Sequence, residues 1–323
     1  MNFSKCDSLF NYGMKVSIYS AKKAANDESG VGWHKGGDRI SYFGNGIKKD
    51  IMYYSKSYYT LSFSYKFTHD DDTVYFAYSF PYTYQDMMND IYEIENDPAR
   101  RAICSRKTLT KTIAGVDCEM LTITEKGEYQ EMMNKKFVVI SGRVHPGEVV
   151  GSWMMRGVLN FLTDPDSHEA TLLRKKFIFK VVPMLNPDGV INGNYRCSLA
   201  GCDLNRRWKA PNRKLHPTIY ALKKMIRTLH EERGVMLYCD LHGHSRKQNV
   251  FMYGCNNKAK PEECRMFPLI LSKLSPIFKF ESCKFGVQKS KESCARVSMY
   301  KELKTCPNVF TMESTFSGID YGE

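Results

Sequence analysis

Apolar and polar residues alternate in two short runs near the amino terminus. The runs are Leu61, Phe63, Tyr65, Phe67 and Val74, Phe76, Tyr78, Phe80. Alternation with a period of two is typical of half-buried strands, and the polar segment 68–73 between the runs indicates a turn. The pattern predicts a β-hairpin in a β-rich region that ends near residue 84.

After residue 84, short apolar runs alternate with helical patterns, which is typical of an α/β domain. Interior strands are predicted at 137–140, 177–185, 235–241, 249–253 and 308–312. A helix is predicted where Val150, Met154, Val158 and Leu162 recur every four residues, and a second over 217–231, with Pro217 in its first turn. The sequence therefore predicts a β-rich domain over 1–84 and an α/β domain over 85–323.

The composition is that of an ordinary globular protein, with 42% hydrophobic and 25% charged residues in 323. We expect a soluble cytoplasmic protein with no membrane partner, because the amino terminus lacks a signal-like apolar stretch and no segment has the roughly 18 apolar residues of a membrane span. Eleven cysteines without a CxxC pair indicate reduced thiols.

The charge balance points to an acidic partner. Lys and Arg number 47 against 35 Asp and Glu, a formal charge of +12. Such a surplus suits nucleic acid, an anionic membrane or a polypeptide rich in Glu and Asp. No zinc-finger spacing or RNA-binding aromatic motif supports nucleic acid, so we expect no nucleic-acid partner.

Two strand ends carry side chains that could bind a metal ion. His145 and Glu148 follow the strand 137–140 within the motif His-Pro-Gly-Glu, and His242 and His244 follow the strand 235–241. A catalytic zinc ion usually takes three protein ligands from His and carboxylate groups and keeps a fourth position open. We expect His145, Glu148 and one of the two later histidines to bind one zinc ion, with His242 nearer the strand end and His244 in reserve.

Other polar residues could act on a substrate at such a site. Glu313 follows the apolar strand 308–312 and could exchange protons as a general base, although alone it also fits a surface carboxylate. The glycine-punctuated segment 186–208 contains Arg196, Asn205 and Arg206, which could hold a carboxylate and polarise a carbonyl. Taken singly, each of these arginines is more typical of a solvated surface charge.

The ordered motifs HPGE, NPDGVINGNYR, DLNRRW, DLHGHS and TMES resemble those of the zinc metallocarboxypeptidases, and specifically the cytosolic carboxypeptidase subfamily. The resemblance implies a zinc carboxypeptidase domain, with a mixed central sheet flanked by helices, preceded by a small β-sandwich. It also implies removal of carboxy-terminal glutamate from polyglutamylated or Glu-ending proteins such as tubulin, with a cytoplasmic location at microtubules or cilia.

The resemblance also assigns roles to single residues. It implies zinc ligation by His145, Glu148 and His242, and a general base at Glu313. Arg196 would stabilise the oxyanion, and Asn205 with Arg206 would hold the terminal carboxylate. Arg296 would lie at the base of the specificity pocket and pair with a glutamate side chain.

The sequence departs from the subfamily pattern in three places. We expect an incomplete β-sandwich and a missing carboxy-terminal helix, because the chain carries only part of the sandwich and stops ten residues after Glu313. The segment 286–291 contains no tyrosine, so no catalytic tyrosine is assigned.

Two other functions fit some of these residues. A zinc amidohydrolase of acyl-amino acids would use a similar His-Glu-His site but would not need a clamp for a terminal carboxylate. A catalytically inactive module that binds acidic tails would explain the charge, although the residues expected for catalysis are all present.

Overall fold

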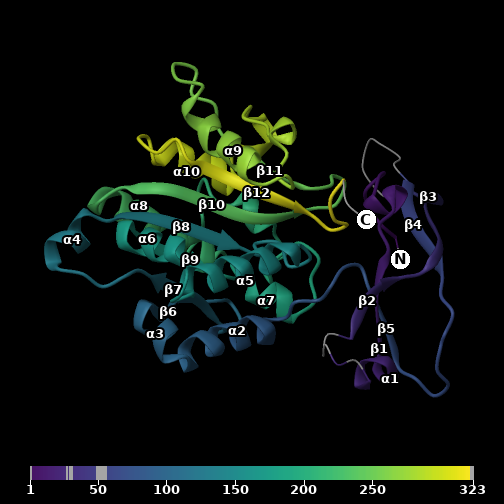
Figure 1. Ribbon diagram of the computed structural model, residues 1–323. Helices are drawn as coiled ribbons and strands as arrows, with labels where there is room; N and C mark the ends of the chain where they lie inside the picture. The colour runs from purple at the N-terminus through teal and green to yellow at the C-terminus, as the bar shows by residue number, and fades with distance from the viewer. Residues whose placement is uncertain (1, 27, 29–31, 49–56, 321–323) are drawn as a thin grey trace. The chain divides into compact units, whose positions relative to one another are not determined.

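The computed structural model describes residues 2–26, 28, 32–48 and 57–320, and the chain forms two compact units (Figure 1). Unit 1 comprises Met1–Pro81, His244–Gln248 and Thr315–Glu323; unit 2 comprises Tyr82–Gly243 and Asn249–Ser314. Within the described residues, no helix combines the length and the apolar character that crossing a membrane requires.

Unit 1 contains two small antiparallel sheets. Its elements are η1 (Leu9–Tyr12), β1 (Val16–Ser20), α1 (Ala21–Ala25), β2 (Trp33–Gly36), β3 (Asp38–Lys48), β4 (Ser57–Ser64) and β5 (Val74–Ala77). One sheet has the strand order β2-β1-β5 and the other pairs β3 with β4. The buried side chains of Leu9, Phe10 and Ile18 belong to the core of this unit.

The predicted hairpin over 61–80 is wrong, because its two strands belong to different sheets. β4 pairs with β3, whereas β5 pairs with β1. The polar segment between them does turn, at Asp70 and Asp71, but it joins strands of different sheets. The Asp72 carboxylate accepts hydrogen bonds from the Ser20 hydroxyl and the Lys22 backbone at the start of α1. Alternation specifies which side chains share a face of a strand but does not specify the partner strand.

Unit 2 has the mixed sheet flanked by helices that the sequence predicted (Figure 1). Its strands are β6 (Cys104–Lys111), β7 (Asp117–Ile123), β8 (Lys136–Gly142), β9 (Phe177–Val182), β10 (Val235–His244), β11 (Val250–Tyr253) and β12 (Val309–Thr315). Its α-helices are α2 (Tyr84–Asn96), α3 (Pro98–Ile103), α4 (Tyr129–Asn134), α5 (Val150–Thr163), α6 (His168–Lys176), α7 (Pro187–Ile191), α8 (Pro217–Glu232), α9 (Glu263–Leu274) and α10 (Ala295–Glu302). Short 3-10 turns are η2 (Leu204–Arg206), η3 (Phe280–Ser282) and η4 (Lys289–Lys291).

The strand order of this sheet is β11-β12-β10-β8-β9-β7-β6. The three central strands β10, β8 and β9 are parallel, with Asp240 opposite Ser141 and Ile140 opposite Val181. β7, β6 and β11 run antiparallel to their partners β9, β7 and β12. Because the central strands are parallel, the segments that leave their carboxyl ends lie at one edge of the sheet, where binding sites of such sheets usually form.

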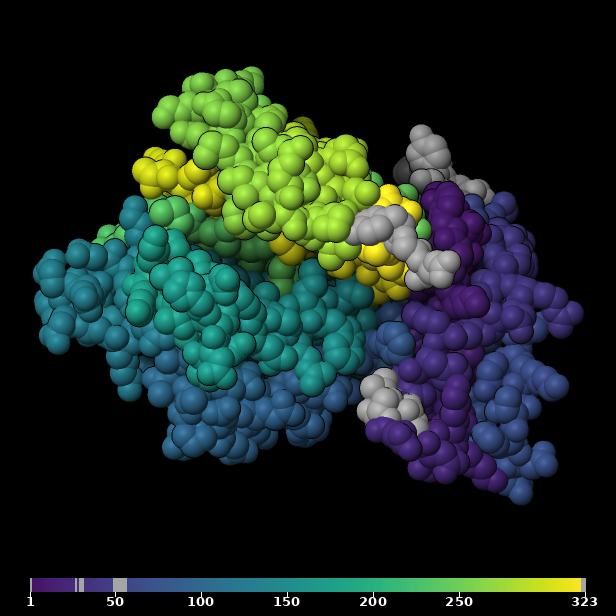
Figure 2. Space-filling model, in the orientation of Figure 1, coloured from purple at the N-terminus to yellow at the C-terminus, as the bar shows by residue number. Residues whose placement is uncertain are grey.

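Helices cover both faces of the sheet, so the central strands have two buried faces. α2, α5 and α9 pack on one face in a core that includes Ile91, Leu159 and Cys264. α8 and α10 pack on the other, where Trp208, Leu222 and Met299 are buried. In the space-filling view, the side chains of flanking segments hide most of the central strands (Figure 2). Burying one large apolar side chain stabilises a fold by roughly 1.5–3 kcal/mol, so these two cores hold the sheet edge in place.

The predicted helices and strands of this unit are present with small differences. The face of α5 is rotated: Met155, Leu159 and Leu162 are buried, whereas Met154 and Val158 are partly buried. The helix packs two neighbouring rows of side chains on the sheet, and a four-residue spacing follows only one of them.

Candidate functional site

The motif that carries His145 and Glu148 is a tight loop after β8, and buried side-chain contacts hold its shape. The buried guanidinium of Arg143 donates hydrogen bonds to the Pro146 carbonyl and to the Ser152 hydroxyl, at 2.7 and 2.8 Å. A side chain at Gly147 would place its Cβ 2.7 Å from the backbone oxygen of Tyr195, so only glycine fits there. The loop therefore presents His145 and Glu148 together at the edge of the sheet.

Three side chains that could bind a metal converge at this edge. One ligand atom from each of His145, Glu148 and His242 lies within 4.8 Å of the others. The Glu148 carboxylate lies between the two imidazoles, with Oε1 2.8 Å from Nδ1 of His145 and Oε2 2.8 Å from Nδ1 of His242. This is the donor set, two imidazole nitrogens and one carboxylate, that zinc prefers in catalytic sites.

Each imidazole is held from its other nitrogen by a buried or half-buried aspartate. Nε2 of His145 lies 3.0 Å from Asp203, and Nε2 of His242 lies 2.7 Å from Asp240. Asp240 in turn accepts a hydrogen bond from the Ser141 hydroxyl at 2.7 Å. Metal-binding histidines are commonly oriented in this way, because a carboxylate on one nitrogen leaves the lone pair of the other directed at the metal.

The electrostatics of the group fit a bound cation. Burial raises the pKa of Glu148, but the charges of His145 and His242 outweigh it and hold that pKa well below its ordinary value. Burial lowers the pKa of His242, but Asp240 and Glu148 raise it well above the usual range. Nδ1 of His145 is buried and has no hydrogen-bond partner of acceptable geometry. The carboxylates thus attract positive charge and an unsatisfied nitrogen points into the group, so the residues fit zinc.

His244, the alternative ligand, is not part of this group among the described residues. Its Nδ1 accepts a hydrogen bond from the Lys247 backbone at 3.0 Å. Alternation does not separate the two histidines, because His242 and His244 are two residues apart within β10. They differ in their contacts, since the His242 imidazole lies between Glu148 and Asp240.

Glu313 lies inside β12 and not beyond its end, since the strand continues to Thr315. The residue is opposite Phe251 of β11, and its side chain is half-buried. Burial raises the pKa of Glu313 to about 7, with Glu148 adding to the increase and the two site histidines opposing it. A carboxyl group with a pKa near neutrality can both accept and return a proton.

Arg196, Asn205 and Arg206 are brought to the metal group through Asp203. Arg196 contacts the Asp203 carboxylate at 2.8 Å and lies 3.6 Å from Glu148. Nδ2 of Asn205 is 3.4 Å from Nε2 of His242, and Arg206 donates to the Asn205 carbonyl at 2.9 Å. The segment 186–208 thus places two guanidinium groups and an amide beside the two histidines.

Arg296 is buried in the first turn of α10. Its guanidinium donates to the Gly254 carbonyl, contacts the Cys255 thiol at 3.6 Å and lies over the ring of Tyr253. The neighbouring Ala295 amide donates to Oδ1 of Asn205 at 2.8 Å. The turn that carries Arg296 is therefore joined directly to Asn205.

Sequence reasoning missed two residues of this site. No local pattern indicates Asp203, because only the folded loop brings it to His145. Lys291 lies in the segment 286–291, to which the sequence assigns no role. Burial and the neighbouring charges of Arg206 and Arg196 nevertheless lower the pKa of its ammonium group. Three cations, Arg196, Arg206 and Lys291, therefore gather near Asp203 beside the metal group, which indicates a site for an anionic ligand.

Replacing Asp240 with Asn should weaken zinc binding about 10–100-fold, because the imidazole of His242 loses the carboxylate that orients it. Competition with a chromogenic chelator measures the affinity, and circular dichroism verifies the fold. Asp166→Asn, at an exposed position in the segment before α6, is the matched control. Unchanged zinc affinity in Asp240→Asn would show that this contact does not orient the ligand.

Comparison with known proteins shows which family this chain matches. The sequence profile described as zinc carboxypeptidase matches residues 95–275. Cytosolic carboxypeptidase 2 of Xenopus tropicalis is 48% identical over 99% of the chain and 33% of its own length. Cytosolic carboxypeptidase 3 of Mus musculus is 45% identical over 100% of the chain and 32% of its own length. The chain thus spans about a third of the length of these relatives.

A solved structure agrees at the level of the fold. The crystal structure of a metallo-carboxypeptidase from Burkholderia cenocepacia superposes with a TM-score of 0.72 at 23% sequence identity. The match covers 95% of this chain and 73% of that one.

Proposed function

This chain belongs to the zinc carboxypeptidase family, and from that premise we propose that it removes carboxy-terminal glutamate residues from acidic protein tails. The proposal extends to polyglutamylated or Glu-ending proteins such as tubulin as substrates, and to the cytoplasm, at microtubules or cilia, as the location. The relatives are cytosolic carboxypeptidases, which supports the reaction class and the compartment.

The observation that carries the choice of glutamate is the environment of Arg296. The side chain is buried, and its contacts in the described part of the chain are a carbonyl, a thiol and an aromatic ring. A buried guanidinium that lacks a carboxylate partner is costly, so a ligand that brings a carboxylate gains a strong interaction there. A carboxy-terminal glutamate brings two carboxylates, one for Arg296 and one for the cations beside Asn205.

The roles of the residues follow from their places around the metal group. His145, Glu148 and His242 would hold zinc, which when bound acts as a Lewis acid on the scissile carbonyl and on the attacking water. Glu313 takes a proton from that water as its oxygen bonds to the carbonyl carbon, and returns the proton to the amide nitrogen as the carbon–nitrogen bond breaks. Arg196 donates to the carbonyl oxygen as negative charge develops. Asn205 and Arg206 bind the terminal carboxylate.

Arg296→Gln should lower kcat/KM on a peptide ending in Glu by about 10–100-fold, because the side-chain carboxylate then enters a pocket without its cation. The same variant should change kcat/KM little on a peptide ending in Gln, which carries no charge. The matched control is Arg265→Gln, because Arg265 is a cation of α9 that lies over the ring of Phe285. An equal loss on both peptides would mean that Arg296 supports the fold of α10 and does not recognise glutamate.

The two remaining functions are separated by what the zinc-loaded protein does. Hydrolysis of acyl-amino acids with no release from peptides would indicate an amidohydrolase. Tight binding of Glu-ending peptides without any release would indicate an inactive tail-binding module.

A further inference from the structure

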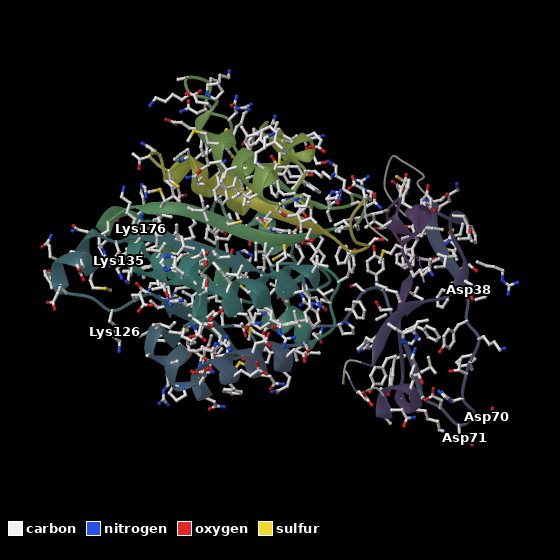
Figure 3. All side chains as sticks on the ribbon, in the orientation of Figure 1. Asp38, Asp70, Asp71, Lys126, Lys135 and Lys176 are labelled. Atoms are coloured by element: carbon white, nitrogen blue, oxygen red, sulfur yellow. The ribbon has the colours of Figure 1, made fainter. Side chains whose placement is uncertain are left out.

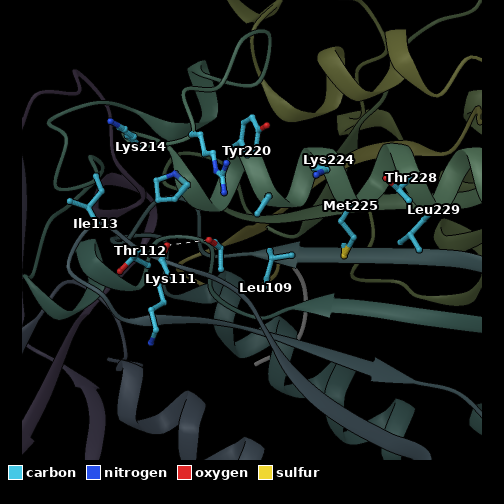
Figure 4. A pocket seen from close by; sticks show the side chains of 14 residues that line it. Leu109, Lys111, Thr112, Ile113, Lys214, Tyr220, Lys224, Met225, Thr228 and Leu229 are labelled. Atoms are coloured by element: carbon cyan, nitrogen blue, oxygen red, sulfur yellow. Dashed lines mark hydrogen bonds between the residues drawn. The ribbon is translucent and has the colours of Figure 1, made fainter.

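A groove in unit 2 lies between the edge strand β6 and helix α8, and it contains none of the residues of the metal group. Its volume is about 790 Å³. The strand side includes Leu109, Lys111 and Ile113, and the helix side includes Tyr220, Lys224 and Met225 (Figure 4). Since β6 is the last strand of the sheet, its outer edge has no partner strand within the described residues.

The charges in this groove are all of one sign. Its lining includes Lys111, Arg213, Lys214 and Lys224 and contains no aspartate or glutamate. Lys111 extends away from α8, and its ammonium group lies 3.0 Å from Asp117 (Figure 4). The other three cations are exposed. They form a positive surface that no internal carboxylate of the groove neutralises.

The neighbouring turns of α8 carry charges of both signs. A second cavity of about 400 Å³ shares Tyr220, Lys224 and Thr228 with the groove and adds two cations, Lys223 and Arg227, and one carboxylate, Glu231. Lys223 is buried against the Trp208 carbonyl, whereas Arg227 remains exposed and lies 3.8 Å from Glu302. Glu302 and Glu231 balance these cations, so the unbalanced positive surface is confined to the groove.

We propose that this groove, lined by Arg213, Lys214 and Lys224 above the edge of β6, is a binding site for an extended acidic polypeptide. Aliphatic side chains, Leu109, Met225 and Leu229, form its floor and suit the methylene groups of glutamate. Tyr220 is the only aromatic residue in the lining, so the groove lacks the stacking platform that single-stranded nucleic acid usually requires. The outer backbone groups of β6 can bond to an extended chain, and nucleic acid has no equivalent.

The size of the groove sets the length of its ligand. The lining runs from Pro217 to Leu229 along α8, and twelve helical steps of 1.5 Å span about 18 Å. An extended chain covers about 3.3–3.6 Å per residue, so about five or six residues fill the groove. This inference does not depend on the proposed reaction, because the bound segment needs no free carboxyl terminus.

A peptide of about six glutamates, acetylated and amidated at its ends and labelled with a fluorophore, tests the site. Its amide terminus removes the carboxylate that the metal site would hold, so binding is measured apart from hydrolysis. We expect fluorescence anisotropy to show that the peptide binds. The double variant Arg213→Glu with Lys224→Glu should bind about tenfold more weakly, because attraction becomes repulsion. A neutral glutamine peptide should not bind.

The matched control is Lys126→Glu with Lys176→Glu, which changes the net charge equally at two exposed lysines labelled in Figure 3 at the α4 and α6 end of unit 2. We expect this control to bind the peptide nearly as tightly as the unaltered protein. Arg213→Gln with Lys224→Gln provides a milder variant if charge reversal disturbs folding.

Three results would overturn the proposal. Equal weakening by the two charge-reversed pairs would mean that only the overall charge of the protein attracts the peptide. No binding of the glutamate peptide would mean that the groove is not a site for acidic chains. Tighter binding of a single-stranded RNA oligonucleotide, also lost in Arg213→Glu with Lys224→Glu, would assign the groove to nucleic acid.

Discussion

Glu313→Gln should lower peptide hydrolysis by about 10²–10⁴-fold while zinc binding and folding are retained. The substitution keeps the size of the side chain and its place on β12 but removes the proton acceptor. Burial raises the pKa of the Glu313 carboxyl to about 7, so in the unaltered protein the group exchanges protons near neutral pH. An amide neither accepts a proton from the water nor returns one to the leaving nitrogen. Both the attack of the water and the departure of the amine should therefore slow.

The measurement is kcat on a Glu-ending peptide, with the metal content determined on the same samples. Glu263→Gln, at a carboxylate in the first turn of α9, is the matched control and should keep full activity. A Glu313→Gln protein that contained zinc and hydrolysed peptide at the unaltered rate would remove Glu313 from the mechanism.

His145→Ala should abolish zinc binding and hydrolysis together. Two ligands bind zinc far more weakly than three, and the remaining carboxylate loses one of the two positive groups that hold its pKa low. Removing His145 also leaves Glu148 and Asp203 each without one polar partner, which typically costs about 1–3 kcal/mol, so the variant should unfold at lower denaturant concentration.

Zinc content after dialysis, hydrolysis and urea unfolding test this prediction in parallel. His168→Ala removes an exposed histidine from the start of α6 and should leave all three unchanged. Treating the unaltered protein with a chelator should abolish hydrolysis, and added zinc should restore it. Full activity of His145→Ala at normal zinc content would contradict the assignment of this residue as a ligand.

Local pattern in the sequence predicted much of unit 2 because parallel strands and their ends obey local rules. The run 137–140 becomes β8, and the run 235–241 becomes most of β10. Once both strands are placed in one parallel sheet, the side chains that follow them must meet at one edge. The sequence alone therefore predicts that His145 and His242 lie close together.

The remaining features depend on pairing and on the folding of long loops, which a local pattern does not specify. β4 and β5 alternate as predicted, but their partners are β3 and β1. Asp203 reaches His145 only because the loop before η2 folds back over the metal group. By contrast, the sequence alone indicates Asp240 as a group that could orient His242, since it lies two residues away on a predicted strand. The role of Arg296 rests on family resemblance, because nothing in the local sequence predicts its burial.

Release of free glutamate from a synthetic peptide ending in several glutamates tests the central claim most directly. The assay compares the zinc-loaded protein with the same protein in a chelator and with Glu313→Gln. The account predicts release by the zinc-loaded protein alone, with loss of activity in both comparisons. No release by a folded protein that contains zinc, or equal release by Glu313→Gln, would contradict it.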